Sequence, residues 1–236
     1  MEFYSHIGQD KWVTEVFRRA RGGYFLDFGA FDGITTSNTL FLEKELGWFG
    51  ICVEPNPRYY ADVCRLRNCI KVNCALWTKS RESLEFRDAH GLSSLATFGG
   101  NDNHAETRRN APIIRVDTIN PNELLKRFNA PSYIHYMSLD TEGCEFEILE
   151  AIQLDEFKIA TMTIEHNHEP IKRDKIRHLL SNLGYSHAAN KNDDFFYHWE
   201  HIEHLTGGVP DAFLDPREAA DQVIKTYRIK EVVCNY

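Results

Sequence analysis

Short apolar segments of strand length alternate with longer segments of helical period along this chain of 236 residues. The apolar runs predict strands at 24–28, 49–53, 70–77, 113–116, 134–139 and 160–164, with closing strands around 185 and 195–199. A further strand at 83–87 is expected to pair beside 70–77. The helical periods predict helices at 10–19, 36–46, 57–67, 121–128, 142–152 and 172–183, and a last helix begins near 215. Residues 90–110 have neither period and are predicted to form a long loop.

Strands that alternate with helices predict an α/β fold with a mostly parallel sheet and helices on both faces. The chain has no internal repeat and no low-complexity linker, so we expect a single domain over 1–236. Ligands of such sheets bind beyond the carboxyl ends of the strands. Attention therefore falls on the residues that follow the strands, listed in order as the Gly29 to Gly33 loop, Glu54, the turn after Trp77, Asp140, and Glu165 with His166.

The formal net charge of −8 argues against a general nucleic-acid binder, because a phosphate backbone requires a basic face. Arg108 and Arg109 are interpreted as solvated surface. The six cysteines include no C-x-x-C pair and are expected to be free, buried thiols. No apolar run is long enough for a membrane span and the first residues resemble no signal peptide, so we expect a cytoplasmic protein without a membrane partner. The oligomeric state is not predicted.

The first predicted strand runs into the loop Asp27-x-Gly29-x-x-x-Gly33, and Glu54 ends the next strand. A carboxylate at that second position can accept hydrogen bonds from both ribose hydroxyls of an adenosine cofactor, although Glu54 could also simply end a strand and face water. The loop lacks the G-x-G-x-x-G spacing of a dinucleotide site, and the charge of Asp32 would oppose a pyrophosphate. S-adenosylmethionine carries no phosphate and has a sulfonium cation, so it suits these carboxylates better than NAD does.

An ordered set of motifs strengthens this interpretation: FLDFGAFDG, CVEPNP, NCAL, VDTI, SLDTEGCEFEILEA and IEHN. In this order they resemble the FkbM family of S-adenosylmethionine-dependent methyltransferases over a core of about residues 8–200, and Gly8-Gln9-Asp10 resembles a segment of some relatives. The resemblance implies a Rossmann-like class I methyltransferase fold with a seven-stranded sheet, to which about 201–236 would add a C-terminal helical extension. The family resemblance does not reach about 201–236, and the helical extension there is expected from the sequence alone. The resemblance also implies O-methylation of a hydroxyl on a sugar or another small molecule. Phe31, Asp32 and Cys144 depart from the common pattern.

Matching positions of the family imply roles for individual residues. Asp27, Gly29 and Gly33 would shape the methionine pocket, Glu54 would hold the ribose with Asn56 beside it, and Ala75 and Leu76 would flank the adenine. Asp140 would face the amino end of the cofactor or the acceptor. The same segments add Ala30, Phe31, Ser37, Asn38 and Pro55 to the predicted cofactor-binding residues. The G-x-S-S-L segment at 91–95 would close over the site.

Methylation of a hydroxyl requires that its proton be removed, so a base is expected at the strand ends. We predict His166, Asp140 and Glu142 as catalytic residues, with Glu165 as a further candidate; a purely structural role for His166 is the alternative. Asp140, Glu142, Glu165, His166 and His168 together suit magnesium or manganese, but a site without a metal is preferred. The rival functions are an NAD-dependent oxidoreductase and a noncatalytic module that keeps the fold.

Overall fold

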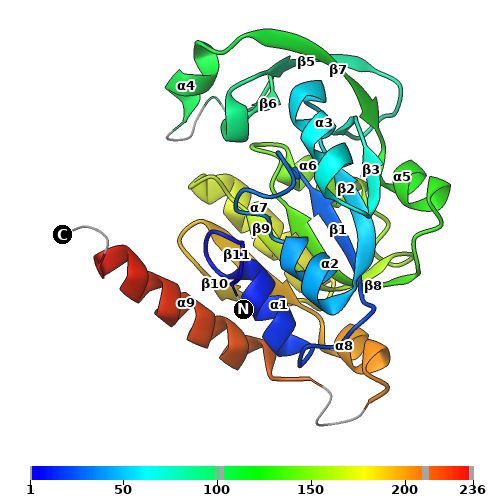
Figure 1. Ribbon diagram of the computed structural model, residues 1–236, viewed down its shortest axis with the longest axis vertical. Coiled ribbons are helices and arrows are strands. Elements are labelled where there is room, and N and C mark those ends of the chain that lie inside the picture. The colour runs from blue at the N-terminus through cyan, green and yellow to red at the C-terminus, as the bar shows by residue number, and fades with distance from the viewer. Residues whose placement is uncertain (1, 99, 101–103, 209–212, 234–236) are drawn as a thin grey trace.

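The computed structural model describes residues 2–98, 100, 104–208 and 213–233. Its main sheet has seven strands in the order β10-β11-β9-β8-β1-β2-β3, and every strand except β11 runs parallel to the others (Figure 1). The strands are β1 (Tyr24–Phe28), β2 (Phe49–Val53), β3 (Ile70–Val72), β8 (Tyr133–Leu139), β9 (Lys158–Glu165), β10 (Ser186–Ala189) and β11 (Asp193–Tyr197). The predicted mostly parallel, seven-stranded sheet is confirmed.

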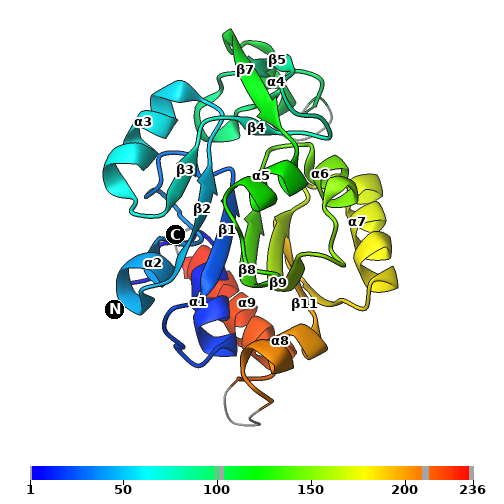
Figure 2. The ribbon, with the colours of Figure 1, turned by 90° about the vertical axis from the view of Figure 1, so that its right-hand side faces the viewer.

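Helices cover both faces of this sheet, as predicted (Figure 2). One layer packs against the face that includes Phe25 and Tyr136, and consists of α1 (Gln9–Val16), α2 (Leu40–Leu46), α3 (Pro57–Leu66), α8 (Trp199–Leu205) and α9 (Pro216–Val233). The other layer packs against the face that includes Leu26 and Leu139, and consists of α5 (Pro121–Arg127), α6 (Glu145–Ala151) and α7 (Pro170–Asn182). The C-terminal segment therefore contributes α8 and α9 to the first layer.

A second, smaller sheet lies above the carboxyl ends of the main sheet, in the upper part of Figure 1. Its strand order is β4-β7-β5-β6, with β4 (Ala75–Leu76), β7 (Ile113–Ile119), β5 (Ser83–Arg87) and β6 (Ser94–Leu95). The prediction of one strand over 70–77 with 83–87 as its partner is wrong. Asn73 interrupts that strand, because its side-chain amide donates hydrogen bonds to the carbonyl oxygens of Glu54 and Pro55, at 2.8 and 3.0 Å. The chain then passes from the main sheet to the small one, where β5 pairs with β7 and β6.

The predicted loop at 90–110 is only partly a loop. It contains a 3-10 turn η1 (His90–Leu92), strand β6 and a short helix α4 (Ala105–Arg109); residues 99 and 101–103 lie outside the described part. We call residues 88–98 and 104–110 the lid segment.

Two helices begin later than predicted. Helix α2 starts at Leu40, with Thr39 as its N-cap residue, rather than at Thr36 or Ser37, although the Ser37 hydroxyl accepts the backbone N–H groups of Thr39 and Leu40 as a capping side chain does. Helix α6 starts at Glu145 rather than at Glu142, whose φ of 58° lies in the left-handed region.

Among the described residues, no helix is long and apolar enough to cross a membrane. The five cysteines within them are free thiols, of which Cys64 is exposed and Cys74 half-buried. Cys234 lies outside the described residues.

Candidate active site

Two adjoining hollows lie beyond the carboxyl ends of β1, β2 and β8, beneath the lid segment. The first, the apolar hollow, is lined mainly by Phe31, Val53, Glu54, Pro55, Ala75, Leu76, Phe86, Gly91, Leu95 and Cys144. The second, the polar hollow, has a volume of about 290 Å³ and is lined mainly by Asp27, Ala30, Thr35, Thr36, Ser37, Asn38 and Leu92. Gly29, Phe31, Gly91 and Asp140 line both hollows. A ligand that fills both would therefore pass Asp140.

Most of the predicted cofactor residues line these hollows, and Gly33 and Asn56 do not. Gly33 has a φ of 81° and packs against Arg67 and Val63, so its missing β-carbon makes room for α3. Asn56 caps α3 by accepting the N–H of Arg58, and its amide donates to Asp88 at 2.8 Å. Both residues therefore position α3 beside the site and do not line the hollows themselves.

The turn of the glycine loop is fixed by contacts within the chain. Gly29 has a φ of 97°, and a β-carbon there would lie 1.7 Å from the carbonyl oxygen of Asp140. This position therefore requires glycine because the Asp140 backbone passes directly against it. The Asp32 carboxylate accepts the backbone N–H groups of Ile34 and Thr35 at 2.9 and 2.7 Å, so a side chain already satisfies the amides after the turn.

Glu54 is buried at the end of β2 and is held by the backbone on both sides. One carboxylate oxygen accepts the N–H of Phe31 at 2.9 Å and the other accepts the N–H of Asn56 at 2.8 Å. Burial raises its pKa to about 8, against the lowering effect of these hydrogen bonds. Each carboxylate oxygen has two acceptor positions, so both can still accept a ligand hydroxyl.

Three carboxyl groups, including that of Asp140, lie close together at this edge of the sheet. Oxygens of Asp140, Glu142 and Glu165 all lie within 4.8 Å of one another. The sequence therefore identified these three correctly as neighbours. His166 and His168 are not part of this group, because they line a separate hollow with Pro170, Arg173, Asp174 and Arg177. His166 is buried, its pKa is lowered by burial to about 4, and it accepts the N–H of His168. The predicted role of His166 as the base thus has no geometric support.

A family model described as the methyltransferase FkbM domain matches residues 27–187, which include β1, the two hollows and the three carboxyl groups. This chain belongs to the FkbM methyltransferase family. Its sheet order and single antiparallel strand are those of a class I methyltransferase fold.

Solved structures similar to this FkbM domain include two methyltransferases. The METTL16 MTase domain is 9% identical with a TM-score of 0.42, and the match covers 79% of this chain and 64% of that one. The human methyltransferase 10 domain containing protein is 11% identical with a TM-score of 0.42, and the match covers 80% of each chain. A search of the curated proteins finds no match.

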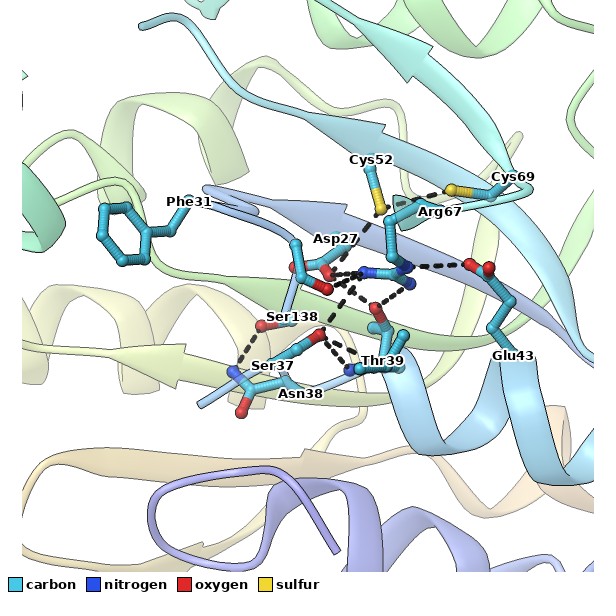
Figure 3. Close-up of polar contacts among 12 residues, drawn as sticks. Asp27, Phe31, Ser37, Asn38, Thr39, Glu43, Cys52, Arg67, Cys69 and Ser138 are labelled. Carbon is cyan, nitrogen blue, oxygen red and sulfur yellow. Dashed lines mark hydrogen bonds and ion pairs between the residues drawn. The ribbon is translucent and has the colours of Figure 1, made fainter. Parts of the chain in front are cut away.

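Sequence reasoning did not find the buried arginine beneath the glycine loop of this FkbM domain. Figure 3 shows Arg67 reaching from the end of α3 toward Asp27 and Glu43. Its guanidinium lies 3.5 Å from the Asp27 carboxylate and 2.9 Å from that of Glu43, and it donates to the Thr39 hydroxyl at 2.8 Å. These contacts join β1, α2 and α3, so the loop between them is held in place from below.

The lid segment of the FkbM domain is tied to α3 on one side and to the loop after β8 on the other. His90 shares a hydrogen bond of 2.6 Å with the Tyr59 hydroxyl, and Tyr59 also packs on the ring of Phe31. On the other side Arg108 forms an ion pair with Glu142. Only 1% of Arg108 is exposed, so its interpretation as solvated surface is wrong. A charged residue in a segment without period gave no sign of this contact.

Proposed function

We propose that this protein transfers a methyl group from S-adenosylmethionine to a hydroxyl oxygen of a sugar or another small molecule. The observation that carries the proposal is the pair of hollows that meet at Asp140, one apolar with Glu54 at its edge and the other lined by carboxylates and hydroxyls.

The side chains of the two hollows fit the parts of this cofactor. Ala75, Leu76, Phe86 and Leu95 offer apolar walls for an adenine, and Glu54 offers acceptors for the ribose hydroxyls. Asn38 lines the polar hollow, and its side-chain amide donates to Ser138 while its oxygen, though buried, has no hydrogen-bond partner. A buried acceptor without a partner is costly, so a ligand donor such as an ammonium group would satisfy it.

The glycine loop disfavours the rival dinucleotide. A pyrophosphate binds to free backbone N–H groups at the turn and at the start of the next helix. Here the side chain of Asp32 occupies the N–H groups of the turn, and Ser37 occupies those at the start of α2. A second anion at this place would meet the charge of Asp32.

When bound, S-adenosylmethionine supplies an electrophilic methyl group on a sulfonium. The protein must hold the acceptor in line with that methyl group, keep water out and take up the hydroxyl proton. We assign the proton to Asp140, because it lines both hollows, whereas Glu142 is engaged by Arg108. The lid segment covers the apolar hollow with Gly91, Ser93 and Leu95.

Calorimetry with S-adenosylmethionine, and with NAD in parallel, tests the cofactor. We expect binding of S-adenosylmethionine alone, weakened about tenfold in E54Q, because the amide replaces one of the two carboxyl oxygens that can accept a ribose hydroxyl with an NH₂ group that only donates. Glu45, an exposed glutamate of α2, changed to glutamine, is the control. Binding of NAD, or no binding of S-adenosylmethionine by folded protein, would overturn the proposal.

A screen of hydroxyl-bearing acceptors with a cofactor labelled in its methyl group tests the reaction. In D140N we expect unchanged cofactor binding and a loss of label transfer of about 100-fold or more. Label transferred only to nitrogen would contradict O-methylation. Tight cofactor binding without transfer to any acceptor would favour the noncatalytic module.

A further inference from the structure

Three carboxyl groups lie side by side at the ends of neighbouring strands β8, β9 and β11, and one of them, Asp140, lines the polar hollow. Glu165 ends β9 directly opposite Asp193, the first residue of β11. Asp140 follows β8, whose last residues Ser138 and Leu139 pair with Thr163 and Ile164 of β9. Asp140 and Glu165 thus both come two residues after the paired Ser138 and Thr163, so their side chains share one face of the sheet.

The lysine and arginine side chains near these three carboxyl groups, Asp140, Glu165 and Asp193, form ion pairs with other residues. Lys172 lies 2.8 Å from Glu145 and donates to the Asn167 oxygen at 2.6 Å. Arg108 pairs with Glu142. Among the described residues, no lysine or arginine forms an ion pair with Asp140, Glu165 or Asp193.

Side-chain amides donate hydrogen bonds to these carboxyl groups. The Asn167 amide donates to Glu165 at 2.7 Å and to Glu142 at 2.9 Å, and the Gln9 amide donates to Asp193 at 2.9 Å. Gln9 belongs to the Gly8-Gln9-Asp10 segment. These N–H groups occupy lone pairs that a metal ion would need. Oxygens of Asp140 and Glu165 lie within 4.8 Å of one another, and no lysine or arginine of the described residues pairs with either. Two ionised carboxylates at this separation repel, so a proton on one of them relieves the repulsion.

We propose that Glu165 is a protonated, neutral positioning residue that donates a hydrogen bond to Asp140, and so holds Asp140 as the ionised base for the acceptor hydroxyl. This inference rests on the proposed function. The new element is that the carboxyl cluster holds a proton rather than a metal ion, and that the proton resides on Glu165.

The charges around the pair decide which member keeps the proton. Burial and the neighbouring charges of Asp140, Glu142 and Asp193 raise the pKa of Glu165 well above its usual range. Burial raises the pKa of Asp140 to about 6, and the charges of Glu145 and Asp27 also raise it. A hydrogen bond from Glu165 and the charge of Lys172 lower it, so the rise is smaller than for Glu165. Burial and the charge of Asp140 raise the pKa of Asp193 to about 7, against the hydrogen bond from Gln9. At neutral pH Glu165 is therefore neutral and Asp140 ionised.

This arrangement balances the charges of the reaction. The acceptor oxygen forms its bond to the methyl carbon, the carbon–sulfur bond breaks with its electron pair going to sulfur, and the hydroxyl proton moves to Asp140. The positive charge of the sulfonium and the negative charge of Asp140 disappear together, so no net charge is left in a partly buried site.

An infrared spectrum tests the proton directly and needs no acceptor. At slightly alkaline pH we expect the C=O stretch of a protonated carboxyl group in the difference spectrum of wild type minus E165Q, and no such band in wild type minus E150Q, which changes an exposed glutamate of α6. Glu54, with a pKa of about 8, absorbs equally in all three proteins and cancels in the differences. Absence of the band from wild type minus E165Q would overturn the proposal. So would titration with Mn²⁺ alone if the wild type binds the ion and E165Q does not.

Turnover with an acceptor from the screen separates a neutral donor from a charged ligand. Glutamine can still donate a hydrogen bond to Asp140, so E165Q should keep about a third of the turnover or more, whereas E165L should lose about tenfold. The acid limb of the pH profile should move to higher pH in E165L, because Asp140 loses a hydrogen bond that favours its ionised form. Equal losses in both variants would overturn the positioning role. Calorimetry with S-adenosylmethionine reports separately on the proposed function, and its failure would leave the infrared result standing on its own.

Discussion

Arg108 of α4 and Glu142, three residues beyond β8, form an ion pair between side chains that are 1% and 9% exposed. The pair joins the lid segment to the strand end where the carboxyl groups converge. Glu142 adopts a left-handed backbone conformation with a φ of 58°, which non-glycine residues seldom adopt. Its backbone and its ion pair together hold the lid over the hollows.

Replacement of Arg108 by methionine should loosen the lid. The change leaves a buried carboxylate without its cation, which typically costs about 3–5 kcal/mol when no rearrangement relieves it. Opening of the lid would relieve it, so we expect faster amide hydrogen exchange over 88–98 and weaker binding of S-adenosylmethionine. R109M alters the exposed neighbour and serves as the control. Equal exchange in both variants would refute the role of Arg108.

Replacement of Arg67 by methionine should destabilise the whole domain. Arg67 is 2% exposed and pairs with Asp27 and Glu43, so its loss leaves two buried carboxylates without their cation. Urea unfolding should show a loss of about 3–5 kcal/mol. The exposed pair of Arg65 with Asp62 offers a control, since R65M should change stability by about 1 kcal/mol or less. A loss no larger in R67M than in R65M would contradict this account.

Alanine at Gly29 should be far more damaging than alanine at Gly22. Both glycines have positive φ, so each substitution carries backbone strain of about 1–2 kcal/mol. A β-carbon at Gly22 meets nothing within 4 Å, whereas one at Gly29 meets the Asp140 carbonyl. We expect the free energy of unfolding, measured with urea, to be lower for G29A than for G22A by about 2 kcal/mol or more. Similar stability of the two would show that the backbone of Asp140 can move away.

Ionisation of Glu54 should destabilise the protein without cofactor as pH rises. Its folded-state pKa of about 8 exceeds the ordinary value of 4.5, so its stabilising contribution is complete below about pH 4.5 and is lost as pH rises to about 8. His135 and His166, whose pKa values are lowered to about 4, act in the opposite direction below about pH 6.5.

The effect of Glu54 is therefore clearest from about pH 6.5 to 8. Over this range the free energy of unfolding should fall more steeply in the wild type than in E54Q, as measured by urea unfolding at several pH values. E45Q should follow the wild type. Parallel curves for wild type and E54Q would show that Glu54 is already ionised at neutral pH.

The central strands and the hollows were predictable because their signals are local. The strands at 24–28 and 49–53 are short, buried apolar runs, and the residues after them necessarily meet at one edge of the sheet. Asn73 was harder, since only its contacts with the backbone of Glu54 and Pro55 reveal that the chain changes sheets there.

Side-chain direction and long-range pairing limited the rest. Glu165 and His166 are neighbours in sequence at a strand end, where successive side chains point to opposite faces, and only Glu165 reaches Asp140. Arg67 and Arg108 were hidden for another reason. Their carboxylate partners lie 24 or more positions away in sequence, and an isolated arginine has no pattern that distinguishes burial from exposure.

The contacts of Asp32 have a consequence for how the cofactor is received. In a dinucleotide site the backbone N–H groups of the turn have no anion to bind until a phosphate arrives. Here the chain supplies its own anion, and the amides of Ile34 and Thr35 are saturated beforehand. The conformation of the loop is therefore set by the chain itself and does not depend on the bound cofactor. Selectivity for the cofactor then depends on residues outside the loop, with Glu54 in the apolar hollow and the unpartnered Asn38 oxygen in the polar hollow.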